Sequence, residues 1–217
     1  DVQFHEFEAP PEPKQAVPLM VKPASEYDAG LSAWFRPLIS KGAFVAGGCF
    51  KQFLTNATPR DVDIWFATQE DFFSMCDRLD DNSKYVRSYS TDRSVGYKHT
   101  VHDITLDLVR MRFGTPSEIL TSFDFTVCQM AYYLNDAGEP TIAYHPRFSS
   151  DLQNKLLYMD EVSERFITPD AVFNRMIKYV KDYGYTPTHE LKIWMFTTLA
   201  SMKCSPSVSP VNSLNTY

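Results

Sequence analysis

The sequence is short of three features that would each define a class of protein. No apolar run approaches the roughly 18 residues that a membrane-spanning helix requires. Its four cysteines are far apart and form no CxxC pair, which argues against a zinc site and a disulfide scaffold. The 27 acidic residues outnumber the 21 basic ones, unlike a protein that holds long nucleic acid by charge. With no signal-like segment at the start of the sequence, we expect a cytoplasmic protein that contacts no membrane.

What is present indicates one large folded domain with small additions. Hydrophobic residues make up 44% of the 217 residues and aromatic residues 14%, enough for a sizeable core. Between residues 62 and 113 the order of elements is strand, helix, then two or three strands, which favours an α+β fold with a mixed sheet and helices on one side. We divide the chain into an extended proline-rich arm (1–24), a head domain (25–158), a helical neck (159–203) and a flexible tail (204–217).

The neck contains the helix that the sequence specifies best. Residues 168–185 read TPDAVFNRMIKYVKDYGY. Thr168 is a suitable N-cap, Pro169 suits the first helical position, and Gly184 is suited to a left-handed end. On the polar side of this helix lie Arg175 and Lys178, whose ordinary role would be a solvated surface.

Residues 44–68 raise the main question of the chain, because a hydrophobic run stops at Gly47-Gly48 and two alternating aspartates follow. On a strand, Asp61 and Asp63 point to the same face. Paired carboxylates repel each other unless a cation joins them, and Mg²⁺ prefers oxygen ligands and phosphates. The alternative is an exposed strand edge with two solvated acids.

A third carboxylate strengthens the metal interpretation. Asp107 lies among apolar residues in ITLDLVRMR, where an isolated charge is costly to bury. Simple alternation also allows Asp107 to face solvent, and Asp103 is a weaker competitor in a turn. Gly47 and Gly48 allow a backbone to approach a phosphate closely, and Lys51 follows within reach.

Other reactive residues have ordinary structural interpretations. His99 and His102 are close in sequence but lack a third metal ligand at a useful spacing. Cys128 would be reactive only with a lowered pKa, and a buried structural cysteine is the simpler reading. Phe123 and its aromatic neighbours are typical of a core, although one ring is able to stack on a base.

Five segments in a fixed order carry a resemblance to a known family. They are GGCFKQFLTN followed by ATPR and Asp61-Val62-Asp63; Asp107 with Arg112 five residues on; SFDFTVCQMAY; HPRFSSDLQNK; and PDAVFNRMIKYVKDYGY. Together they span roughly residues 43–185. This order resembles the head and neck of bacterial-type CCA-adding enzymes and poly(A) polymerases, in the nucleotidyltransferase superfamily of DNA polymerase β.

The resemblance implies a polymerase β-like nucleotidyltransferase head with a short helical neck. It also implies transfer of an NMP from an NTP to an acceptor hydroxyl, with the 3′ end of an RNA such as tRNA as the favoured acceptor. Asp61, Asp63 and Asp107 would be catalytic and bind Mg²⁺ or Mn²⁺. The implied nucleotide-binding residues are Gly47, Gly48, Lys51, Arg112, Asp124, Thr126, Arg175 and Lys178.

Departures from the family pattern leave other functions open. Lys51-Gln52 stands where the family has Arg-Asp, and Phe123, Cys128 and Val172 replace motif residues. The later element that pairs with the incoming base has no convincing counterpart. The alternatives are NMP transfer to a protein or small molecule, or a non-catalytic relative that binds a nucleotide or a partner.

Overall fold

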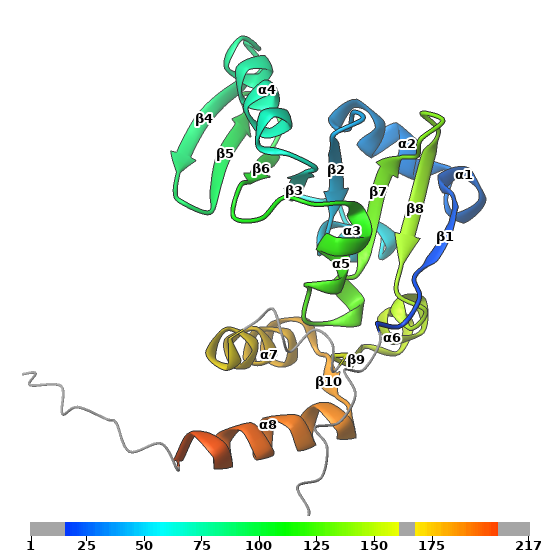
Figure 1. Cartoon of the computed structure of the whole chain (residues 1–217), viewed down its shortest axis with the longest axis vertical. Coiled ribbons are helices and arrows are strands. Elements are labelled where there is room, and N and C mark those ends of the chain that lie inside the picture. The colour runs from blue at the N-terminus through cyan, green and yellow to red at the C-terminus, as the bar shows by residue number, and fades with distance from the viewer. Residues whose placement is uncertain (1–15, 161–167, 204–217) are drawn as a thin grey trace, which may run out of the picture.

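An eight-stranded mixed sheet forms the head, as the computed structural model of residues 16–160 and 168–203 describes it (Figure 1). The strand order is β1-β8-β7-β2-β3-β6-β5-β4. Neighbouring strands pair antiparallel except β3 and β6, which are parallel. The strands are β1 (Met20–Pro23), β2 (Ala43–Ala46), β3 (Asp61–Phe66), β4 (Tyr85–Ser90), β5 (Ser94–His99), β6 (Thr105–Val109), β7 (Met130–Leu134) and β8 (Pro140–Tyr144). The predicted α+β class is confirmed.

The helices cover both faces of this sheet and extend below it as the neck. They are α1 (Ala24–Tyr27), α2 (Gly30–Phe35), α3 (Cys49–Leu54), α4 (Gln69–Asp80), α5 (Pro116–Thr121), α6 (Phe148–Asn154), α7 (Pro169–Tyr183) and α8 (His189–Lys203), with 3-10 turns η1 (Arg36–Leu38) and η2 (Thr126–Cys128). Thr68 caps α4, since its hydroxyl accepts a hydrogen bond from the Asp71 N–H at 3.2 Å.

Alternation along β2 separates two apolar cores. Ala43 and Val45 pack in a large core with α2, α3 and α4, whereas Phe44 and Ala46 pack in a smaller core on the other face with Ile119 of α5. The expectation of helices on one side only is therefore wrong. An amphipathic pattern in the sequence does not say which face of the sheet a helix such as α5 covers.

The structure agrees in part with the arm and neck that the sequence predicts. Met20–Pro23 leaves the expected arm and pairs with β8 at the sheet edge. In the neck, α7 begins after Thr168, whose side chain makes no capping hydrogen bond, and ends at Gly184 with φ of 73°, as predicted. The other predictions for 1–15, 161–167 and 204–217 lie outside the described residues.

The neck is joined to the head by a third core and a small second sheet. Phe125 and Val127 of the head pack with Val172, Met176 and other apolar residues of α7. The parallel pair β9 (Leu156–Leu157) and β10 (Thr186–Pro187) adds backbone hydrogen bonds. In the part of the chain that the structure covers, no helix has the length and apolar character to cross a membrane.

Candidate functional site

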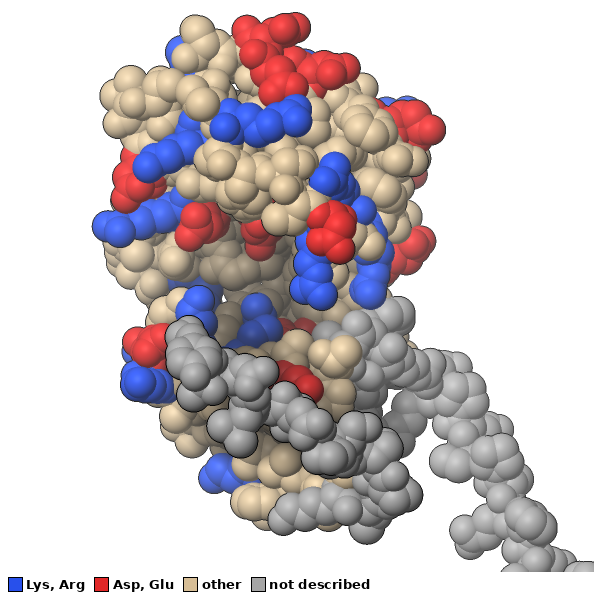
Figure 2. Space-filling view, turned by 90° about the vertical axis from the view of Figure 1, so that its left-hand side faces the viewer, with Lys and Arg blue, Asp and Glu red and all other residues tan. Residues whose placement is uncertain are grey.

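A cavity of about 450 Å³ opens between the head and α7. Figure 2 shows the hollow, with both acidic and basic groups around it. Of the residues predicted to form the site, the wall includes Gly47, Gly48, Lys51, Asp61, Asp63, Arg112, Asp124, Arg175 and Lys178. Residues that sequence reasoning did not single out also line it: Trp65, Arg93, Met111, Tyr179 and Tyr183.

The two aspartates of β3 lie on one face of the sheet, as their spacing predicts. Asp63 is directly opposite Asp107 in the parallel pairing of β3 with β6. Burial, and after it the neighbouring carboxylates of Asp107 and Asp61, raise the pKa of Asp63 to about 7. Asp63 is thus a partly buried acid beside like charges, which a bound cation would stabilise in its ionised form.

Asp107 is close to these acids but is not in the cavity wall. The Tyr89 hydroxyl donates a hydrogen bond to its Oδ1 atom at 2.6 Å. Across residues 16–160 and 168–203, no three or more His, Cys, Asp or Glu side chains are grouped so as to hold a metal ion. Asp107 is thus level with Asp63 across the two strands, and its carboxylate is hydrogen-bonded to Tyr89.

The glycine turn brings the backbone close to this acidic row. Gly47 has φ of 109°, a left-handed conformation that favours glycine. A Cβ added there would lie 3.6 Å from Asp63 Oδ2. The Gly47 N–H donates to the Met130 carbonyl at 3.1 Å, so it is already used within the protein.

Lys51 points to the neck. Its ammonium donates to the Tyr179 hydroxyl at 3.0 Å and lies 4.2 Å and 4.6 Å from the ring centres of Tyr179 and Tyr183. Burial lowers the pKa of Lys51, and the nearby Arg175 and Lys178 lower it further. The Lys51 ammonium lies at the cavity wall, and its partners there are aromatic side chains of α7.

Arg175 and Asp124 form an ion pair between neck and head. Arg175 Nε and Nη2 donate to the two carboxylate oxygens of Asp124 at 2.6 Å and 3.3 Å. Cys128 Sγ lies 2.9 Å from the Tyr179 hydroxyl, and burial raises the pKa of this thiol. Cys128 is therefore a buried protonated thiol, which agrees with its structural interpretation.

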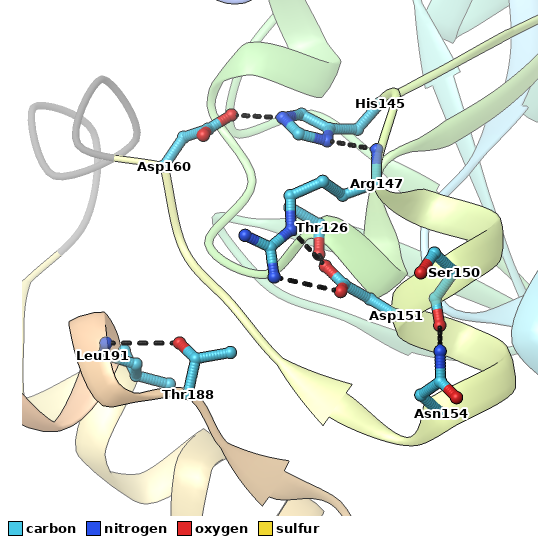
Figure 3. A network of polar contacts seen from close by, with 9 residues as sticks. All are labelled: Thr126, His145, Arg147, Ser150, Asp151, Asn154, Asp160, Thr188 and Leu191. Carbon is cyan, nitrogen blue, oxygen red and sulfur yellow. Dashed lines mark hydrogen bonds and ion pairs between the residues drawn. The ribbon is translucent and has the colours of Figure 1, made fainter.

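Thr126 lies away from the cavity wall. It is fully buried, and its hydroxyl donates to Asp151 Oδ2 at 2.6 Å (Figure 3). Arg147 donates to both oxygens of the same carboxylate at 3.1 Å, while His145 pairs with Asp160 at 2.5 Å. This network ties α6 to the segment around η2, a structural use that the FDFT pattern alone did not indicate.

The mixed sheet and the helical neck have the arrangement of a polymerase β-like nucleotidyltransferase fold, with the paired carboxylates at the cavity between them. A CCA-adding enzyme in complex with ATP matches with a TM-score of 0.64 at 16% identity, over 88% of this chain and 49% of that one. The Thermotoga maritima CCA-adding enzyme complexed with tRNA matches with a TM-score of 0.58 at 15% identity, over 83% of this chain and 46% of that one. The expected fold is confirmed.

Within that fold, the chain belongs to the Gabija anti-defense 2 family, whose model matches residues 23–155, more than half of the sequence. Gabija anti-defense 2 of Bacillus phage SPbetaL7 is 29% identical over 153 residues, which is 70% of this chain and 36% of that protein. The chain therefore spans about a third of the curated relative and about half of the solved structures that it matches.

Proposed function

We propose that this chain is a metal-dependent nucleotidyltransferase that transfers an NMP from an NTP to a hydroxyl group of an acceptor. The observation that carries the proposal is the pair Asp61 and Asp63 at the wall of the cavity. Asp63 is partly buried beside two other acids, and the described part of the chain has no ion pair that involves it. A carboxylate in such surroundings is a suitable ligand for a divalent cation.

The two carboxylates at the cavity wall are oxygen donors of the kind that a hard divalent cation such as Mg²⁺ or Mn²⁺ prefers. Asp61 and Asp63 would hold it, with Asp107 directly beside Asp63 on the neighbouring strand. When bound, the cation would supply positive charge that activates the acceptor hydroxyl and stabilises the leaving pyrophosphate. The protein's own task is to hold these carboxylates on one face of the sheet, which the parallel pairing of β3 and β6 supports.

The remaining walls suit a triphosphate. Lys178 and Arg112, predicted from the sequence, and Arg93 of the β4–β5 turn bring positive charge to the cavity of a chain whose net charge is −6. Gly47 and Gly48 allow a phosphate to approach the backbone. The pair Arg175–Asp124 shapes the neck side, and the Phe123 ring gives an apolar face for a base.

For the acceptor, we favour a protein of the defence that the family name refers to. The name of the phage relative refers to action against that defence, and the net charge of −6 does not favour an RNA held by charge alone. A tRNA 3′ end, the acceptor implied by the resemblance, stays a prediction. The non-catalytic alternative is favoured by one observation, the use of Lys51 in contacts with Tyr179 and Tyr183.

A labelling experiment tests the proposal. The protein is incubated with each α-labelled NTP and Mg²⁺, together with tRNA, total RNA or an extract that contains the Gabija proteins, beside an Asp61→Ala/Asp63→Ala variant. Metal-dependent label on a protein, absent with the variant, supports the proposal as stated. Label on RNA keeps the reaction but changes the acceptor. Neither label nor NTP binding in any fraction would sink the catalytic proposal in favour of the non-catalytic alternative.

A further inference from the structure

An irregularity in the edge strand β4 turns one tyrosine to the carboxylate face of the sheet. Arg87 pairs with Tyr97 of β5, and the next paired residue is Tyr89, opposite Gly96. Two positions along β4 therefore correspond to one along β5, which is a β-bulge. Arg87 contacts Asp80 of α4 on one side of the sheet. Because Gly96 and Tyr97 are adjacent in β5, Tyr89 faces the opposite side.

The bulge places Tyr89 at the start of a row across four strands. Tyr89 is opposite Gly96, Gly96 is opposite Asp107, and Asp107 is opposite Asp63. The tyrosine ring crosses Gly96, where an added Cβ would come within 2.1 Å of a ring carbon. Only glycine at position 96 leaves room for the Tyr89 ring. The hydroxyl at the end of that ring donates a hydrogen bond of 2.6 Å to Asp107 Oδ1.

The contact with Asp107 is more than packing. Tyr89 is 41% exposed, so its ring adds little to the core. Carboxylates that bind metals are commonly held by such outer hydrogen bonds, which fix their orientation and leave the other oxygen to the metal.

We propose that Tyr89 is a positioning residue, which reaches across Gly96 to hold the Asp107 carboxylate for a divalent cation bound beside Asp61 and Asp63. This inference rests on the proposed function, because it concerns the third acid of the same metal site. It adds a residue from the far edge of the sheet that lies outside the cavity wall. It also gives Gly96 a defined role, as the passage for the tyrosine ring.

Direct binding of Mn²⁺, followed by the paramagnetic resonance signal of the free ion, tests this role without NTP or acceptor. Tyr89→Phe keeps the ring and removes the hydroxyl, and we expect it to weaken Mn²⁺ binding about 10-fold. Gly96→Ala should weaken binding in the same direction, because the new methyl group displaces the ring. Tyr85→Phe is the matched control: it removes another hydroxyl from β4 and should leave Mn²⁺ affinity unchanged.

Combined variants separate positioning from general damage to the sheet. In an Asp107→Asn background, Tyr89→Phe should cause no further loss, since its effect passes through that carboxylate. Mn²⁺ affinity of Tyr89→Phe equal to or tighter than the wild type would overturn the inference and leave the proposed function standing. No Mn²⁺ binding by the wild type would overturn both. Thermal unfolding of each variant checks that the fold is retained.

Discussion

Two carboxylates at the same cavity, Asp63 and Asp124, have opposite surroundings. Asp124 is bound by both donor groups of Arg175 and also accepts from the Phe125 N–H at 2.8 Å. The pKa of Asp63 is raised by burial first, and then by the neighbouring carboxylates of Asp107 and Asp61. The comparison assigns different tasks to similar side chains: Asp124 joins the head to the neck, while Asp63 is held in an environment that favours a cation.

Of the substitutions that test this comparison, Asp63→Asn should have the largest effect. The amide has the same shape without the charge, so we expect transfer to fall on the order of 10³-fold, as when a central electrostatic group of an active site is removed. The free energy of unfolding should stay the same or increase, because a partly buried charge beside like charges disappears. Activity assays and urea unfolding measure the two effects; a variant that is both active and less stable would contradict the assignment.

The pH dependence of unfolding sharpens the same point. The folded-state pKa of Asp63 is raised from 3.8 to about 7, so the folded protein binds a proton more tightly than the unfolded chain between these values. Stability should then decrease as pH rises from 4 to 7, by roughly 4 kcal/mol at most. Without divalent cations, the difference in thermal unfolding between wild type and Asp63→Asn should follow this trend. A constant difference across the range would count against the raised pKa.

Substitution of Asp124 should lower the free energy of unfolding, in contrast to substitution of Asp63. Asp124→Asn weakens the ion pair with Arg175, and we expect a loss of about 2 kcal/mol in the free energy of unfolding. The Arg175 side chain is 47% exposed, so water compensates part of the lost charge pairing. Asp182→Asn, an exposed acid on the same helix, serves as the control and should leave urea unfolding unchanged. Equal stability of the two variants would refute the role of Asp124 as a connection.

The smallest effect concerns Tyr179→Phe. This change keeps the ring but removes the hydroxyl that contacts Lys51 and Cys128, with an expected cost of about 1 kcal/mol in unfolding free energy. Tyr183→Phe keeps its ring beside Lys51 and should cost less. Parallel urea titrations compare the two; a larger loss for Tyr183→Phe would show that hydroxyl contacts are not what connects Lys51 to the neck.

The sequence was most informative where backbone periodicity decides the outcome. Alternation put Asp61 and Asp63 on one face, and the acid in ITLDLVRMR was correctly placed beside them by strand pairing. The left-handed end at Gly184 followed from its lack of a side chain.

Long side chains and tertiary choices were less predictable. Lys51 has several rotatable bonds, and its direction is decided by tyrosines more than 120 positions away. Thr126 bonds to Asp151, which no local pattern specifies. Tyr89 depends on a bulge, and one extra residue in a polar edge strand has no distinctive sequence signature.

The register of β3 and β6 also determines which changes in chain length the site would tolerate. Asp63 and Asp107 meet because both strands run parallel with those residues level. Inserting or deleting one residue within either strand would move one acid to the opposite face, where the large core lies. The loops at the strand ends have no such constraint. Engineering or natural divergence should therefore change the length of the loops around this site freely, while the spacing within the two strands stays fixed.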